Sequence, residues 1–378
     1  MIRLTLAAFL LLLSLVFSPQ NASAKEQKTE ELLKKIRAVD ARGKGHQSAS
    51  LAMEQLVQQD GNALLKILHA FKGANPLAIN WLRSAFETIA ERTFKEKGIF
   101  PNAPLKKFFF ETKNNPHARR LAYEWIQRIE PSFGKQVLPR MLHDPSVEMR
   151  RDAVTMLSKQ AKGLKKKGKK REAKKLYQKA LTGAFDEDQV KSIAKGLKQL
   201  GETINMQQHY GFISQWNMIG PFNNKNKIGF VSVYPPEKKI ALTKKHKGQL
   251  GEVQWKKLST KDPFGVMDIH TLYKNYKGSV MYATTEFYSK ENQNVELRIG
   301  TSNAWKVWVN GKELFAHEEY HRGMKIDQYQ VAAKFNAGKN IILLKICQNE
   351  QDQSWAQKYR FQLRVCKNTG IAIHSDKK

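Results

Sequence analysis

The sequence predicts a two-part protein, a helical array followed by an antiparallel β-sandwich. Residues 295–365 contain short segments in which apolar and polar residues alternate, and Gly, Asn and Asp separate these segments, as in half-buried strands joined by turns. Residues 27–204 instead carry apolar residues three and four positions apart, which is the spacing of amphipathic helices. We therefore expect a helical domain over 25–207, a β domain over 208–370 and a tail over 371–378.

The first 24 residues have the features of a secretory signal peptide. Arg3 provides a basic start, residues 4–17 are nearly all apolar, and residues 22–24 form an Ala-Ser-Ala cleavage signal. An uncleaved anchor is the alternative, but the apolar run is shorter than the roughly 20 residues that cross a bilayer, and Pro19 follows it closely. We expect cleavage before Lys25, no integral membrane segment afterwards, and a secreted, periplasmic or cell-surface protein.

The chain is strongly basic, with a formal net charge of +31 over 378 residues. The excess lies in both parts, because residues 25–208 hold 37 basic and 20 acidic side chains and residues 209–378 hold 27 and 14. Such a protein attracts polyanions, namely acidic polysaccharide, anionic membrane or nucleic acid. Because export argues against a nucleic-acid partner, we expect an extracellular polysaccharide or other polyanion.

One basic run stands out at 161–175. It contains nine cations, interrupted by two glycines: Lys162, Lys165, Lys166, Lys167, Lys169, Lys170, Arg171, Lys174 and Lys175. The run is either a contact for a polyanion or a solvated turn between helices, and the pattern alone favours the solvated turn.

Helix starts recur in the first part. Asn75, Asn115 and Asp144 each precede a proline, which suits an N-cap residue followed by the first helical position. The segment that begins at Asp144 resembles the start of a HEAT-type repeat, and the segment that begins at Asn115 resembles it more weakly. This resemblance covers about residues 47–160 and implies an α-solenoid that binds a protein partner. A further stripe resembles a tetratricopeptide-like helix pair and consists of Ala173, Leu176, Tyr177, Ala180 and Leu181.

The second part contains a more specific pattern. Residues 305–312 read Trp-Lys-Val-Trp-Val-Asn-Gly-Lys, residues 337–346 place Ala-Gly-Lys-Asn before an apolar strand, and an Arg-rich strand closes the set at 359–365. This order resembles the galactose-binding-like jelly roll, the fold of sugar-binding modules in family 2 glycoside hydrolases and of many carbohydrate-binding modules. The resemblance covers about residues 210–367 and implies carbohydrate binding without catalysis. Asn310-Gly311 is expected to form a tight hairpin turn with positive φ.

Relatives of that fold often carry paired acidic residues before the Trp-x-Val strand, where they help to hold calcium. Here residues 301–303 are Thr-Ser-Asn, which lack the carboxylates that calcium prefers. We expect no metal site and no cofactor.

Carbohydrate-binding residues are expected on a loop at the rim of the sandwich. Tyr320, His321 and Arg322 combine an aromatic face with hydrogen-bond donors, which suits stacking on a pyranose ring. Trp308 and Trp355 are further candidate platforms. The alternative for all five is ordinary packing, because tryptophan and tyrosine in sandwiches commonly serve as core or edge cover.

The same segment contains an H-E-x-x-H pattern at 317–321, as in zinc peptidases. That motif requires a helix, which places both histidines on one face beside the metal. We expect strands on both sides, and on an extended chain residues four apart are separated by about 13 Å. A zinc hydrolase using His317, Glu318 and His321 is therefore disfavoured, and no catalytic residues are predicted.

The chain has two cysteines, Cys347 and Cys366. If their strands are neighbours, both thiols point the same way and an oxidising compartment would permit a disulfide. Two free thiols are the alternative.

Three functions remain: a non-catalytic carbohydrate-binding protein, a structural protein of the cell envelope, and the disfavoured hydrolase.

Overall fold

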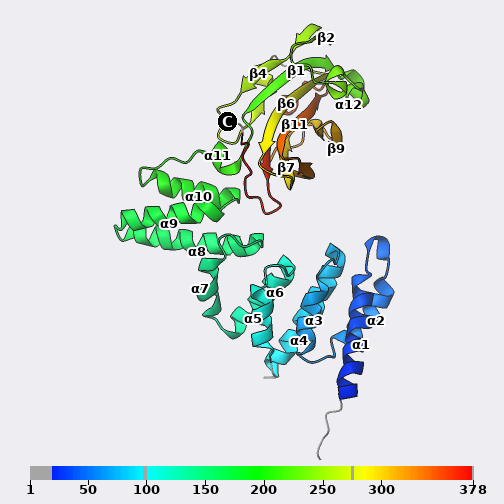
Figure 1. The fold of residues 1–378 in the computed structure, drawn as a ribbon, viewed down its shortest axis with the longest axis vertical. Coiled ribbons are helices and arrows are strands. Elements are labelled where there is room, and N and C mark those ends of the chain that lie inside the picture. Colours follow the sequence, from blue (N-terminus) through cyan, green and yellow to red (C-terminus); the bar gives the residue numbers. More distant parts are fainter. Residues whose placement is uncertain (1–18, 97–99, 274–275, 377–378) are drawn as a thin grey trace, which may run out of the picture. The chain divides into compact units, whose positions relative to one another are not determined.

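The computed structural model describes residues 19–96, 100–273 and 276–376 (Figure 1). Most of the expected signal peptide lies outside these residues. Helix α1 (Pro19–Arg37) includes the expected cleavage site. No helix in the described ranges is long and apolar enough to cross a membrane. The chain forms two compact units, Met1–Ala153 and Val154–Lys378.

The first unit is helical. After α1 come α2 (His46–Leu56), α3 (Ala63–Ala70), α4 (Pro76–Lys95), α5 (Asn102–Phe110), α6 (Pro116–Ile129) and α7 (Phe133–Val137), with 3-10 turns at Ala41–Gly43 and Leu138–Arg140. Helix α8 (Val147–Lys166) begins in this unit and continues into the second. Contacts join α1 to α2, α3 and α4, and α5 to α6.

Two of the three predicted helix caps are confirmed. The side chain of Asn75 accepts a hydrogen bond from the Ala78 backbone, and Asn115 accepts one from Ala118. The third start is wrong, because α8 begins at Val147 rather than beside Asp144. Asp144 instead accepts two hydrogen bonds of 2.8 Å from the guanidinium of Arg119, and both side chains are buried. This bidentate pair links the two segments that carry the repeat-like pattern.

The second unit contains the rest of α8, then α9 (Lys170–Gly183), α10 (Glu187–Lys198) and α11 (Met206–Tyr210). Gly196 lets α10 approach α9 closely, since a Cβ there would lie 2.7 Å from the Tyr177 ring. The His209 ring stacks on Phe185, and its Nε2 lies 2.7 Å from the Ala184 carbonyl. Secondary structure changes from helix to strand between Tyr210 and 215, close to the predicted change at 207/208, although the compact unit begins earlier.

Two antiparallel sheets follow. The six-stranded sheet has the order β4 (Lys256–Ser259), β1 (Gln215–Asn223), β6 (Ser279–Ser289), β11 (Gly338–Gln348), β8 (Ala304–Val309) and β9 (Lys312–His317). The four-stranded sheet has the order β10 (Tyr329–Phe335), β7 (Gln293–Thr301), β12 (Arg360–Cys366) and β5 (Met267–Asp268). β2 (Lys245–Gly248) and β3 (Gly251–Gln254) form a separate hairpin.

Both sheets contribute to one apolar core, in which Trp216 of β1 meets Phe361 of β12 edge to face. The β8–β9 turn has the predicted geometry, with φ of 50° at Asn310 and 82° at Gly311. Helices followed by antiparallel sheets are thus confirmed. Figure 1 shows the helices in blue to green and the strands in green to red.

The outer face of the six-stranded sheet is covered by residues 224–255, which we call the cover segment. It contains a 3-10 turn (Lys225–Lys227) and the short helices α12 (Ile228–Val231) and α13 (Pro235–Lys238). Two short elements lie outside the cover segment, namely α14 (Ile269–Leu272) and a 3-10 turn at Ser354–Ala356. A second apolar cluster joins Phe230 of the cover segment to Tyr282 of β6.

A buried lysine fastens the cover segment to the sheet. Lys345 of β11 is 0% exposed, and its Nζ donates to the carbonyls of Phe230 (3.1 Å) and Ser232 (2.7 Å) and to the Glu237 carboxylate (2.9 Å). All three ammonium protons therefore have an acceptor. Tyr282 also donates to Glu237. This arrangement satisfies the buried charge and fixes the cover segment's position.

The condition for a disulfide, that the two cysteine strands are neighbours, is not met. Cys347 lies on β11 of the six-stranded sheet and Cys366 on β12 of the other, and both thiols are free and buried. Cys347 belongs to the cluster under the cover segment, where burial raises its thiol pKa to about 12. Burial likewise raises the pKa of Cys366. Neither thiol forms the proposed bridge.

Candidate functional site

The rim loop, residues 318–328, follows β9 and is not helical. His317 ends β9, and its Nε2 lies 2.9 Å from Glu319, whereas the Nε2 of His321 lies 2.6 Å from the Asn349 amide oxygen. The helix that a zinc peptidase motif requires is not formed. Within the described part of the chain, no three His, Cys, Asp or Glu side chains are grouped so as to hold a metal.

A buried charge network anchors the end of the rim loop. Asp327 accepts hydrogen bonds from Arg364 of β12 (2.7 Å) and from Arg298 of β7 (2.9 Å), and the Arg364 side chain is 0% exposed. Burial alone would raise the pKa of Asp327, but the two guanidinium groups outweigh it and hold that pKa below its usual value. The rim loop is therefore tied to the four-stranded sheet.

Three predicted residues meet at this loop. The ring of His321 contacts Trp355 edge to face at 5.3 Å between centroids, and Tyr320 lies 6.3 Å from His321. Trp355 is 58% exposed, so the indole is supported from one side and accessible from another. Lys227 of the cover segment lies 5.5 Å above the Tyr320 ring. Aromatic faces and a cation thus share one small region.

A pocket of about 360 Å³ lies beside these rings. Its lining is polar and consists of Asn226, Lys227, Asn349, Glu350 and Gln351. Asn349 belongs to both features, because its amide oxygen receives the hydrogen bond from His321. We call Asn224, Lys227, Tyr320, His321, Asn349 and Trp355 the rim site.

Two buried polar atoms of the rim site have no hydrogen-bond partner among the described residues. They are Oδ1 of Asn224 and Nδ1 of His321. The other side of the Asn224 amide is satisfied, since its Nδ2 donates to the Gln348 carbonyl at 2.9 Å and to the Tyr320 hydroxyl at 3.3 Å. Such unpaired atoms are uncommon in protein interiors and indicate capacity for a further polar partner.

Two of the five predicted residues lie outside this site. Trp308 is only 6% exposed and packs in the cluster beneath the cover segment, so the expectation of a surface platform is wrong there. The sequence could not show that a separate segment covers the outer face of the sheet. Arg322 is exposed and its side chain donates to Glu319 at 2.7 Å, so among the described residues its hydrogen bond goes to the rim loop and not to a rim-site residue.

Sequence reasoning missed Asn224, Lys227 and Asn349. They lie on two segments about 120 residues apart, and the rim loop is a third segment between them. The one available signal is the polar stretch 223–227, Asn-Asn-Lys-Asn-Lys, directly after a strand. The nearby Thr-Ser-Asn stretch at 301–303, weighed as a lost calcium site, is buried and bonded internally: Asn303 donates to Gln348 at 2.9 Å.

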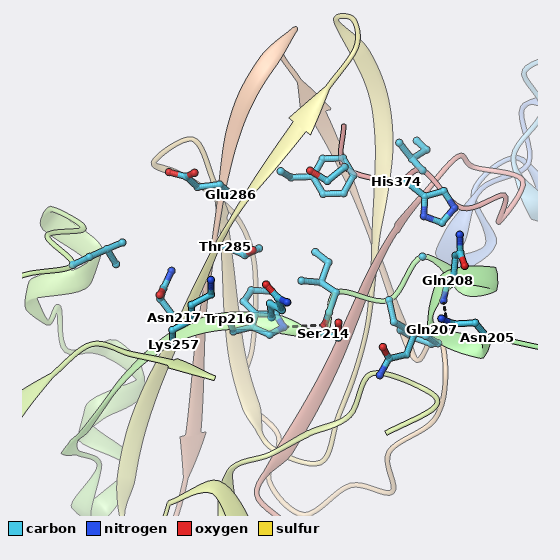
Figure 2. A pocket seen from close by; sticks show the side chains of 18 residues that line it. Asn205, Gln207, Gln208, Ser214, Trp216, Asn217, Lys257, Thr285, Glu286 and His374 are labelled. Carbon is cyan, nitrogen blue, oxygen red and sulfur yellow. Dashed lines mark hydrogen bonds between the residues drawn. The ribbon is translucent and has the colours of Figure 1, made fainter. Parts of the chain in front are cut away.

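A larger groove, of about 580 Å³, lies elsewhere in the β part (Figure 2). Asn205, Gln207 and Gln208, which open and form α11, lie on one side of it, and Glu286 of β6 lies on another (Figure 2). His374 of the tail, to which no role was assigned, also lines it. The groove's polar side chains are scattered along the chain, so no sequence pattern marks it.

The tryptophan and phenylalanine side chains that line the groove are buried, whereas His374 is exposed. Trp216 is 1% exposed and donates its indole N–H to the Ile213 carbonyl at 3.0 Å, and Phe287 is 3% exposed. They belong to the core between the sheets. The groove can form hydrogen bonds, but neither ring offers a face for stacking.

No protein-family model and no curated protein matches the chain. Three solved structures are similar over part of it. The PA14 domain of the antifreeze protein MpAFP is 12% identical with a TM-score of 0.19, over 26% of this chain and 54% of that domain. A family 35 carbohydrate binding module from Clostridium thermocellum is 17% identical with a TM-score of 0.17, over 24% and 78%.

The third is a β-glucosidase from Kluyveromyces marxianus in complex with glucose, 8% identical with a TM-score of 0.27, over 40% of this chain and 16% of that one. The chain therefore spans about half of the PA14 domain and a small part of the glucosidase. These likenesses are too distant to carry a functional conclusion.

Proposed function

We propose that this is a non-catalytic carbohydrate-binding protein and that the rim site holds the sugar. The observation that carries the proposal is the exposed indole of Trp355, supported edge-on by His321, whose ring is hydrogen-bonded to Asn349 in the lining of a small polar pocket. Sugar rings have apolar C–H faces and hydroxyl edges, so they suit an aromatic surface next to amide and charged groups. The jelly-roll resemblance of the β part agrees with this proposal.

Each rim-site group has a distinct task in the proposed complex. Trp355 stacks on the pyranose ring. The amide of Asn349 and the ammonium of Lys227 line the pocket and accept or donate hydrogen bonds to hydroxyl groups. The unpaired Oδ1 of Asn224 and Nδ1 of His321 are buried, so they supply further polar contacts through water.

The remaining parts of the proposal concern the first unit and the location. Export is supported by the N-terminal pattern of a basic residue, an apolar run and Ala-Ser-Ala. A protein partner for the helical unit is supported by the resemblance of residues 47–160 to HEAT-type repeats. A structural protein of the envelope that binds no sugar is the alternative.

A glycan array probed with the full chain tests the proposal at low salt and at ~0.5 M salt, where contacts between exposed charges are largely screened. We expect retention on a defined class of sugars at both salt concentrations. Retention that disappears with salt on every acidic glycan, or no retention, would favour the structural alternative.

Tyr320→Phe is a better rim variant than Tyr320→Ala, because Tyr320 packs against the cluster beneath the cover segment. The substitution removes the hydroxyl that accepts from Asn224 while it keeps the ring. Arg322→Ala is the matched control on the same loop, since the exposed Arg322 side chain pairs with Glu319 rather than with a rim-site residue. We expect weaker retention for the first variant and unchanged retention for the second.

A further inference from the structure

The basic run identified in the sequence forms the tip of a helical hairpin. Helix α8 ends at Lys166, residues 167–169 turn, and α9 begins at Lys170 (Figure 1). Gly168 permits the turn because its φ of 76° is unfavourable for other residues. Residues 162–175, which we call the hairpin tip, contain nine cations and one acid, Glu172. Because the tip is compact, these cations lie close together.

Most of these cations lack a counter-charge. Lys169 pairs with Glu172 at 3.5 Å, Lys174 with Glu202 at 3.0 Å, and Lys165 donates to Gln199. In the described part of the chain, six exposed cations form no ion pair: Lys162, Lys166, Lys167, Lys170, Arg171 and Lys175. The tip therefore presents about six uncompensated positive charges over the end of α8, the connecting turn and the start of α9.

Part of this charge opposes helix stability. Lys169 is the N-cap residue of α9, and Lys170 and Arg171 follow it. Backbone N–H groups already give a helix N-terminus a partial positive charge, so each cation there is unfavourable. N-cap positions favour Ser, Thr, Asp and Asn, and Lys169 makes no capping hydrogen bond. A solvated turn does not require cations at this end, whereas a bound anion would relieve the repulsion.

The chemistry of the tip also limits the class of partner. The apolar side chains Ala161, Ala173, Tyr177 and Ala180 are buried in packing, and no large apolar or aromatic side chain between 161 and 183 is exposed. The tip therefore has nothing to insert into a bilayer and no ring on which a base can stack. It also has one arginine among nine cations, so it meets anionic groups mainly through lysine point charges rather than through bidentate pairs.

We infer that the hairpin tip binds an acidic polysaccharide, whose carboxylate or sulfate groups lie along the unpaired lysines. The choice of a polysaccharide among polyanions rests on the proposed function. The contact itself rests on the charge and geometry of the tip. In the complete chain, the tip holds the acidic groups of a glycan by charge, and the rim site recognises a sugar ring by shape.

The test uses the full chain and polygalacturonate as the probe. Lys162→Gln, Lys166→Gln, Lys167→Gln and Lys170→Gln together remove four unpaired charges and keep helix propensity. The matched control is Lys34→Gln, Lys35→Gln, Lys72→Gln and Lys107→Gln, which removes four exposed lysines from the first unit. Affinity is measured at several salt concentrations, and circular dichroism checks folding.

We expect the tip variant to bind at least tenfold more weakly near 0.1 M salt. The slope of log affinity against log salt should fall by about 3, at ~0.7 per lost contact on a single-stranded polyanion. The control should change affinity by less than threefold. An equal loss in both variants would overturn the proposal, because it would mean that net charge alone drives binding.

Two further outcomes bear on the partner. Tighter binding of a DNA duplex or of phosphatidylglycerol vesicles than of polygalacturonate, lost in the tip variant, would overturn the choice of polysaccharide. The tip variant itself separates this inference from the proposed function, since its four substitutions lie outside the rim site and we expect it to keep wild-type retention on neutral glycans of the array at ~0.5 M salt. If the rim site binds no sugar, the tip still shows its salt-sensitive binding.

Discussion

The rim site and the groove lie in the same β part and differ in what they expose. The groove is larger, at about 580 Å³ against 360 Å³, and it is lined by many amides. Its rings, Trp216 and Phe287, belong to the core, whereas Trp355 of the rim site is 58% exposed. The volume of a pocket is therefore a poor guide to its ligand here. The accessible indole of Trp355 distinguishes the smaller site.

The two sites are also built differently. The rim site joins three loops, each held by buried polar contacts: the start of the cover segment, the rim loop, and residues 349–355. The groove is lined largely by strands, α11 and the tail. Substitutions that remove the polar contacts of these loops should therefore weaken ligand binding at the rim site and leave the groove unchanged.

The largest expected effect is on the cover segment. Lys345→Met removes the ammonium group and leaves Glu237 buried without its cation, so we expect a loss of about 3 kcal/mol or more in the free energy of unfolding. Urea unfolding measures it. The double variant Lys345→Met with Glu237→Leu removes both charges and should recover part of the loss. If the double variant is the less stable of the two, the buried pair is not the anchor.

The next effect concerns the rim loop. Asp327→Asn removes the carboxylate shared by Arg364 and Arg298, and we expect it to lower unfolding free energy by about 3 kcal/mol at pH 7. The folded-state pKa of Asp327 lies below its usual value, so the wild-type contribution is complete above pH ~4 and is lost as the pH falls through the folded pKa.

Urea unfolding at pH 7, 5 and 3 therefore checks whether the stabilisation by Asp327 decreases on acidification. The difference between wild type and Asp327→Asn should be constant from pH 7 to 5 and smaller at pH 3. A difference that grows on acidification would contradict this assignment.

A smaller effect is expected inside the rim site. Asn349→Ala removes the acceptor of the 2.6 Å hydrogen bond from His321, which orients the ring that supports Trp355. A hydrogen bond contributes about 1 kcal/mol, so sugar affinity should fall about fivefold. Calorimetric titration with a glycan retained on the array measures this, and unchanged affinity would mean that His321 needs no such orientation.

The smallest effect is expected in the groove. Asn217→Ala with Lys257→Ala removes two polar side chains that line it (Figure 2). Retention on the same glycan should stay within twofold of wild type. A large loss here, with rim variants unaffected, would move the binding site to the groove.

The sequence predicted the positions of the strands better than it predicted which segment covers the outer face of the six-stranded sheet. Period-two alternation located the strands, and the Asn310-Gly311 turn has the predicted positive φ values, because these features depend on local chain geometry. Tyr320 and His321 were predicted together because they are adjacent in sequence. The contact between His321 and Trp355 could not be predicted, since it depends on how the fold places the rim loop beside the segment that follows β11.

The errors have the same cause. Trp308 was expected at the surface because alternation shows two faces of a strand but not which segment covers the second face. Cys347 and Cys366 were considered as a pair because strand order is not encoded by spacing, and the two strands belong to different sheets. Asn224 and Asn349 are distant in sequence, and only the fold brings both to the rim site.

The most direct test of sugar binding at the rim site compares wild type, Trp355→Phe and Trp355→Ala on the glycan array at ~0.5 M salt. Trp355 is exposed, so neither substitution should lower thermal stability by more than a few tenths of a kcal/mol. We predict that phenylalanine keeps part of the retention and that alanine reduces it at least tenfold. Equal retention by all three proteins would contradict the assignment of Trp355 as the sugar platform.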